Sequence, residues 1–239
     1  MFIFTSGEQV AASDATPTMS LEESCRKGDL EGVKAALQRG DDVNTKNENG
    51  WAGLTWAVYN NHNSVVELLL KTPTIDVNQT DDAGECALYW AVAEHNNEAV
   101  TLLLNVPTID VNIVNSPGHS LLHRAVIGGN VKGLKLLLSH PSLTAGTLNQ
   151  KDKYIGATPL MWAARDGRLK PLAVLAADPR VDLYTIDKEG RSLEEWTRWG
   201  FLVRFNLSVN DLNQYLRDPK SVKIVGEAWQ RWEKRRQEI

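Results

Sequence analysis

Two histidines at helical spacing are the residues whose types and positions come nearest to metal or acid–base chemistry. His119 and His123 lie four residues apart in "HSLLH", a spacing that can present two imidazole rings to zinc from one face of a helix. No acidic residue stands between them to act as a general base, and His119 precedes the point where the helix is expected to begin. Ser120, beside them, lacks the sharp glycine-flanked turn of a nucleophile elbow. We therefore predict neither a metal site nor a catalytic site from this pair.

The rest of the sequence offers no cofactor signature and little to attract nucleic acid. No glycine-rich phosphate loop follows a strand pattern. The two cysteines, Cys25 and Cys86, lie inside helix-like patterns without the spacing of a metal or disulfide pair, which suits a reducing compartment. The net charge of −4 gives no general affinity for phosphates. We expect a non-enzymatic protein without a cofactor, a metal ion or a nucleic acid partner.

Targeting and membrane signals are weak. The stretch "MFIF" at the start has no basic flank, and Glu8 ends the apolar region early, so it makes a poor signal peptide. No apolar run approaches the roughly 20 residues that span a bilayer. The expected location is the cytoplasm or the nucleus, without a membrane span.

The elements that position any functional side chain come from an internal repeat. Similar apolar patterns follow five glycines, at offsets of 34, 34, 38 and 34 residues: Gly50, Gly84, Gly118, Gly156 and Gly190. Each unit has the pattern of a helix, a short turn, a second helix and a loop, and neither helix can bury its apolar face without a neighbouring unit. The hexapeptide "PTIDVN" follows the second helix twice, at 73–78 and 107–112. Because proline ends a helix, we interpret this hexapeptide as architecture.

These units resemble the ankyrin repeat family. The segment "GATPLMWAA" is similar to the family pattern G-x-T-P-L-H-x-A-A, which implies that Thr158 caps the first helix and Pro159 opens it. The segment "GHSLLHRAV" keeps a capping Ser120, and its His123 stands at the position of the family's structural histidine.

Two units depart from the family pattern. "GWAGLTWAV" has Ala52 and Gly53 in place of the Thr-Pro pair, and "GECALYWAV" has Cys86 and Ala87. A lost cap costs about 1 kcal/mol, and glycine in a helix costs roughly 0.5–1 kcal/mol relative to alanine. The second unit is therefore expected to be locally weaker.

The resemblance implies an all-α ankyrin-repeat solenoid of stacked helix-turn-helix units with short β-turn fingers. The helical spacing of Val222, Val225, Trp229 and Trp232 adds a C-terminal helical extension. The first unit has the polar outer face that a terminal repeat needs for solubility, including Glu22 and Glu23. We expect a flexible segment at 1–19, the repeat domain at 20–216 and an amphipathic C-terminal helix at 217–239. Within the domain, the units are a cap at 20–49, then 50–83, 84–117, 118–155 and 156–189, and a degenerate cap at 190–216.

A column of tryptophans is the most informative feature for binding. Trp56, Trp90, Trp162 and Trp196 share one place in the repeat, with Arg124 in the remaining copy. By the family's geometry this place lies on the first helix, on the concave surface beside the fingers. Two interpretations stay open: the rings pack between repeats, or they share that role with recognition of a partner.

The predicted partner-binding residues surround this column on the same surface. They are Trp51, Trp56, Tyr59, Glu85, Trp90, Glu94, His119, Arg124, Ile127, Tyr154, Trp162, Arg165 and Asp166. Charge divides the surface, because residues 50–117 contain one basic and eight acidic side chains, whereas residues 118–189 contain ten basic and six acidic ones. A partner polypeptide would then lie in one direction, with its basic residues over the early repeats. The implied function is that of a monomeric scaffold that binds another protein or peptide segment.

Several alternatives remain. Four extra residues in "SHPSLTAGTLNQKDKYI" form either a binding loop or a tolerated surface loop, with Tyr154 and Ile155 at the following finger. Asn78 and Asn112 lie in turns similar to those that asparaginyl hydroxylases modify, which would make the chain a hydroxylase substrate. "LEEWTRWGFL" with "DLNQYL" is weakly similar to a SOCS box, which would make it an adaptor that recruits substrates to a ubiquitin ligase. The C-terminal helix covers the last repeat or binds a partner or a membrane surface.

Overall fold

The computed structural model describes residues 19–193 and 195–197 of the 239 residues. The expected flexible N-terminal segment up to residue 18, most of the degenerate cap and the C-terminal helix at 217–239 lie outside the described residues. Most of the SOCS-like sequence also lies outside them.

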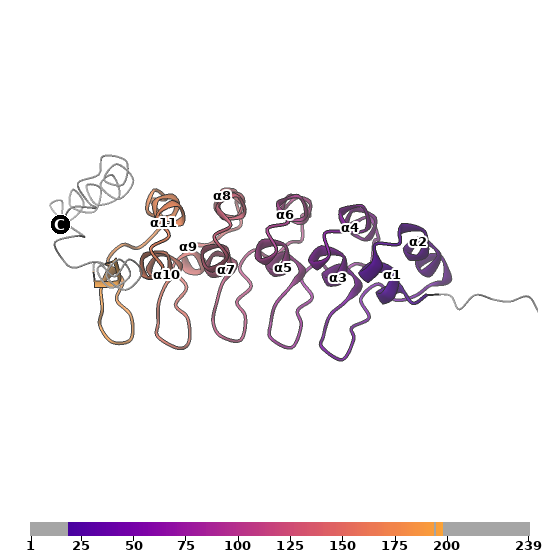
Figure 1. The fold of residues 1–239 in the computed structure, drawn as a ribbon, viewed down its shortest axis with the longest axis horizontal. Helices are drawn as coiled ribbons and strands as arrows, with labels where there is room; N and C mark the ends of the chain where they lie inside the picture. The colour runs from indigo at the N-terminus through magenta and orange to yellow at the C-terminus, as the bar shows by residue number, and fades with distance from the viewer. Residues whose placement is uncertain (1–18, 194, 198–239) are drawn as a thin grey trace, which may run out of the picture.

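The helices form two parallel rows (Figure 1). The first helices of the units are α1 (Leu21–Lys27), α3 (Gly53–Tyr59), α5 (Ala87–Ala93), α7 (Leu121–Gly128) and α10 (Pro159–Arg165). The second helices are α2 (Leu30–Arg39), α4 (Asn63–Leu70), α6 (Asn97–Leu104), α8 (Val131–Ser139) and α11 (Leu169–Ala176). Each helix packs against its partner in the unit and against its counterpart in the next unit. The all-α repeat solenoid is confirmed.

One continuous apolar core runs along the stack between the two rows. Its fully buried side chains include Leu69, Leu88, Leu103, Leu122 and Leu137, which recur at matching places in successive units. Because each of these side chains is covered by the neighbouring unit as well as its own, burial between units holds the rows together. None of the helices in the described part is long and apolar enough to cross a membrane.

The fingers project from the row of first helices (Figure 1). Single antiparallel bridges close three of them, between Lys46 and Ala52, Thr80 and Cys86, and Val114 and Ser120. Gly50 turns the first of these fingers with φ of 77°, in the left-handed region. A Cβ atom there would also lie 2.9 Å from Asp81 Cα of the next finger, so both conformation and close approach require glycine.

The helix starts follow the expected variation in capping. The hydroxyl of Thr158 accepts a hydrogen bond from the Met161 backbone N–H, and Pro159 opens α10. Ala52 and Cys86 precede α3 and α5 without a side-chain cap in the described structure. Gly53 also has a packing role. A Cβ on this residue would lie 2.9 Å from Cys25 Sγ, so the glycine makes room for the sulfur of the preceding unit.

The four extra residues do not form an open loop. They allow a short helix, α9 (Ala145–Leu148), to form between α8 and the next finger. Thr144 caps this helix by accepting from the Thr147 backbone N–H, and Leu148 is buried in the core. This insertion therefore contributes to packing.

Candidate partner-binding face

Asparagine side chains join each unit to the next, and they explain the repeated hexapeptide. Asn78 Nδ2 donates to the Thr108 carbonyl at 2.7 Å, and its Oδ1 accepts from the Asp110 N–H at 2.8 Å. The same two-sided bridge is made by Asn44, Asn112 and Asn149. We call these four residues the asparagine ladder. Both polar ends of each carboxamide are thus engaged, including those of Asn78 and Asn112, the two predicted hydroxylation positions.

In the later units, each column tryptophan is tied to the finger that leads into its own helix. Trp162 Nε1 donates to Asp152 Oδ2 at 3.0 Å, and Trp196 Nε1 donates to Asp187 Oδ2 at 2.9 Å. Burial acts to raise the pKa of the Asp152 carboxyl, but its hydrogen bonds from three backbone N–H groups and the Trp162 indole leave that pKa below its usual value. The carboxylate thus holds the ring in one orientation.

In the early units, the tryptophan indole N–H groups donate to different acceptors. Trp56 Nε1 donates to Glu22 Oε1 of the preceding unit at 3.1 Å, so Glu22 does not belong to the solvent-facing cap. Trp51 Nε1 donates to Asp81 Oδ2 of the following finger, also at 3.1 Å. Asp81 occupies the finger position that serves the column tryptophan in later units. Because Trp51 uses this acceptor, Trp90 Nε1 has no hydrogen-bond partner among the described residues.

Four rings gather into what we call the aromatic cluster: Trp51, Trp56, Tyr59 and Trp90. The centroid of Trp51 lies 4.6 Å from that of Trp56, 4.8 Å from Trp90 and 5.3 Å from Tyr59. The tryptophans are half-buried, while Tyr59 is 38% exposed. Glu94 is exposed at the end of α5, one helical turn beyond Trp90. The cluster therefore packs across two units and still presents aromatic surface to solvent.

The acidic half of the face (residues 50–117) meets its basic half (residues 118–189) between α5 and α7. Asn115 Nδ2 donates to Glu85 Oε1 at 3.1 Å. The Arg124 guanidinium carbon lies 5.7 Å from the centroid of the Tyr89 ring. Burial, followed by the nearby Glu85 charge, raises the pKa of Tyr89, so its hydroxyl stays neutral. Ile127 is half-buried on the same helix as Arg124.

His123 joins two units through both of its ring nitrogens. His123 is fully buried, its Nδ1 accepts from the Ser120 N–H at 3.1 Å, and its Nε2 lies 3.1 Å from the Ala157 carbonyl of the next unit. Burial lowers the pKa of His123 to about 4. The ring of His119 stacks on His123 at 5.2 Å, and burial also lowers the pKa of His119. Both nitrogens of His123 are engaged, and the described part of the chain holds no group of three or more metal-ligating side chains.

In the basic half of the face, formed by the later units, the aromatic side chains do not gather into one cluster as they do in the early units. The Arg165 guanidinium carbon lies 3.9 Å above the centroid of the Trp162 ring, and Arg165 Nε pairs with Asp166 Oδ1 at 3.1 Å. Tyr154 is 71% exposed on the finger and Ile155 is half-buried beside it. The structure thus brings Trp51, Trp56, Tyr59 and Trp90 into mutual ring contact and leaves Tyr154 outside that cluster.

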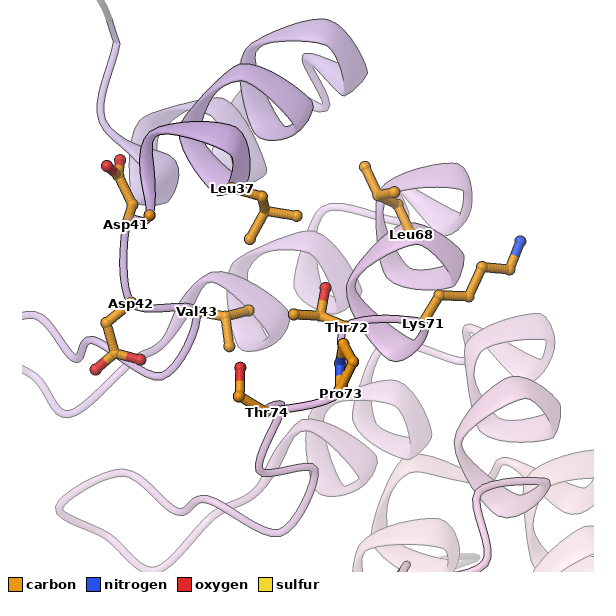
Figure 2. Close-up of a pocket in the computed structure, with 10 residues that line it drawn as sticks. Leu37, Asp41, Asp42, Val43, Leu68, Lys71, Thr72, Pro73 and Thr74 are labelled. Carbon is orange, nitrogen blue, oxygen red and sulfur yellow. The ribbon is translucent and has the colours of Figure 1, made fainter.

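Surface hollows lie on the other row of helices. Leu37, Val43 and Leu68 border a hollow of ≈ 470 Å³ between α2 and α4, with Lys71 directed outward (Figure 2). A hollow of ≈ 390 Å³ recurs between α6 and α8, where Leu104 and Leu136 line it. Because the two occupy the same place in the repeat, we attribute them to repeat geometry.

Comparison with known proteins settles the family. A family model described as "Ankyrin repeats (3 copies)" matches residues 21–115 and 106–187. The chain belongs to the ankyrin repeat family. Ankyrin repeat domain-containing protein 40 from Homo sapiens is 45% identical over 53 residues, and its Mus musculus counterpart is 43% identical over 53 residues. Each match covers 22% of this chain but only 14% and 15% of those proteins.

Ankyrin repeats are generally protein–protein interaction modules, and proteins of this family are typically non-enzymatic scaffolds. In this ankyrin stack, sequence reasoning found the tryptophan column but missed the acidic or amide residues that recur at one place in the fingers, two of which, Asp152 and Asp187, each accept from a column tryptophan. Those residues are the acidic or amide side chains Asn47, Asp81, Asn115, Asp152 and Asp187. Their signal was present, because one of them stands three or four residues before each repeat glycine.

Proposed function

We propose that this chain is a non-catalytic scaffold that binds an extended segment of a partner protein along its first helices and fingers. The observation that carries the proposal is the aromatic cluster, whose rings bridge two units yet keep exposed surface. Half-exposed tryptophan and tyrosine are the side chains that most often dominate interface energetics. A repeat stack supplies the long, rigid surface on which such a segment can lie.

The charge division supports one orientation of the bound segment. The early units carry Asp82, Glu85 and Glu94, and the later units carry Arg124, Lys153 and Arg165. Opposite potentials at the two ends favour a partner whose basic residues lie over the early units, because the reverse orientation places like charges together.

Affinity capture from a lysate tests this proposal. The double variant Trp90→Ala with Glu94→Arg removes a ring and reverses a charge on the face. Glu67→Arg is the matched control, because Glu67 is exposed on α4 in the second-helix row. We expect mass spectrometry to find proteins that wild type and the control retain and the double variant loses, with far-UV helicity unchanged. Equal capture by all three would refute binding at this face.

A further inference from the structure

The later ankyrin units cover their aromatic rings with cations of their own. Arg165 lies 3.9 Å from the centroid of Trp162, and Arg191 lies 4.8 Å from that of Trp196. Arg124 also reaches back to the preceding unit, where it lies over the Tyr89 ring of α5 at 5.7 Å. The face of an aromatic ring is negative and attracts a cation within about 6 Å. In this half of the molecule that attraction is satisfied within the chain.

The aromatic cluster lacks such a cover. Within 19–193 and 195–197, no lysine or arginine lies over the rings of Trp51, Trp56, Tyr59 or Trp90. The only basic side chain of residues 50–117 is Lys71, which follows α4 in the second-helix row and points outward from the hollow there (Figure 2). The four rings of the cluster therefore carry no cation of the described chain over their faces, and Arg124 lies instead over the adjacent Tyr89 ring, which contacts Trp90 at 5.9 Å.

Negative charge surrounds the same rings. Glu22 and Asp81 contact them directly, by accepting from the indole N–H groups of Trp56 and Trp51. Glu94 stands one helical turn beyond Trp90 and is exposed. Carboxylates beside an aromatic face add to its negative potential, so a cation seated there interacts with both.

We propose that the aromatic cluster is a subsite for a cationic side chain of the partner segment. The fitting cations are weakly hydrated, namely an arginine guanidinium or a methylated lysine ammonium, because they lose little hydration on contact with rings. An unmethylated ammonium is more strongly hydrated and gains less. This inference rests on the proposed function, since it names the chemistry that the same face recognises.

Small amino acid derivatives test the subsite without a known partner. The N-acetyl, N-methylamide forms of trimethyllysine, arginine, lysine and norleucine are titrated into the ¹⁵N-labelled full chain, and the indole N–H resonances are followed by NMR. We expect saturable shifts at Trp51, Trp56 and Trp90 with trimethyllysine or arginine, and binding of norleucine weaker by about tenfold or more. Whichever of the two binds more tightly identifies the cation.

Trp162 is an internal control, because Arg165 already covers its ring. Equal shifts with norleucine would show an apolar subsite and overturn the proposal. Equal shifts at Trp162 would show unspecific contact and overturn it as well.

Two pairs of variants sharpen the test. Tyr59→Ala removes one ring and is expected to weaken cation binding about fivefold or more, whereas Tyr59→Phe keeps the ring and stays within about twofold. Glu94→Gln is expected to weaken binding about threefold, and Glu67→Gln, on the second-helix row, to leave it unchanged. If Tyr59→Ala loses helicity, its binding result is set aside. The cation affinities of Tyr59→Phe and Glu94→Gln then test the subsite. Unchanged binding in Glu94→Gln together with equal binding by Tyr59→Ala overturns the subsite.

The capture experiment separates this inference from the proposed function. If no derivative binds but Trp90→Ala with Glu94→Arg still loses partner proteins, the cation subsite is wrong and the binding face stands. If the derivatives bind at the cluster while capture is unaffected by the double variant, the rings bind cations, but the proposed partner-binding face is wrong and the cluster is not a subsite of it.

Discussion

The indole N–H of Trp51 donates to Asp81 across 3.1 Å and so takes the acceptor that the register of the repeat assigns to Trp90. Farther along the chain, the corresponding acceptors Asp152 and Asp187 accept from the tryptophan of the helix that follows their finger. One additional ring in a finger thus changes how two neighbouring units are connected.

In the variant Trp51→Phe, we expect the indole N–H of Trp90 to donate to the Asp81 carboxylate. The phenyl ring keeps most of the packing but donates no hydrogen bond, so Trp90 Nε1 can pair with the vacated oxygen. The free energy of unfolding should fall by less than about 1 kcal/mol, because one hydrogen bond replaces another. Hydrogen exchange at the Trp90 indole should slow. In the double variant Trp51→Phe with Asp81→Ala the acceptor is missing, and exchange should be fast again; equally slow exchange there would contradict the explanation.

The asparagine ladder should contribute measurably to stability. Asn112→Ala removes the bonds to the Ser142 carbonyl and the Thr144 N–H, so urea unfolding should show a loss of about 1–2 kcal/mol. Asn105→Ala is the matched control, because Asn105 is exposed and its side chain makes no hydrogen bond within the described residues. Its substitution should change stability by less than about 0.5 kcal/mol. Equal losses of unfolding free energy in the two variants would show that the asparagine ladder does not contribute to stability.

Stability should fall in mild acid because of His123. Burial lowers its pKa from 6.5 to about 4, so the unfolded chain binds a proton at this residue before the folded chain does. The contribution is fully present above pH 6.5 and is lost as the pH falls toward 4. By pH 5 the loss should reach about 2 kcal/mol. Unfolding of wild type and His123→Gln at pH 8 and pH 5 measures it, and parallel losses in both proteins would assign the effect to other groups.

Asn61 adopts a conformation better suited to glycine. It has φ of 61° after α3, at the place where Gly28, Gly129 and Gly167 follow the first helices of other units. Asn61→Ala should destabilise the protein by about 1 kcal/mol, because a Cβ is disfavoured in the left-handed region. Asn61→Gly should be neutral or stabilising by up to about 1 kcal/mol. Thermal unfolding of both variants checks the order, and a stable Asn61→Ala would exclude a backbone cause.

The repeat and the paired helices follow from periodicity, the capping by Thr158 follows from the family resemblance, and all are present in the structure. The reasons for Gly53 and α9 could not be foreseen, because they depend on what another unit places nearby. Gly53 faces the sulfur of Cys25, and Leu148 fills core space that only the stack creates. The exchange of partners between Trp51 and Trp90 is likewise a contact between units. Sequence patterns report local conformational preference, whereas these features depend on how closely side chains of neighbouring units approach one another.

The asparagine ladder has a direction. Each carboxamide reaches forward along the chain, so the groups that receive a unit always belong to the unit made before it. On the ribosome, a newly emerged repeat therefore meets a finished template whose donors and acceptors are already in position. Growth of the stack from the N-terminal end therefore gives each incoming unit a carboxamide of the preceding unit to which its backbone can bond.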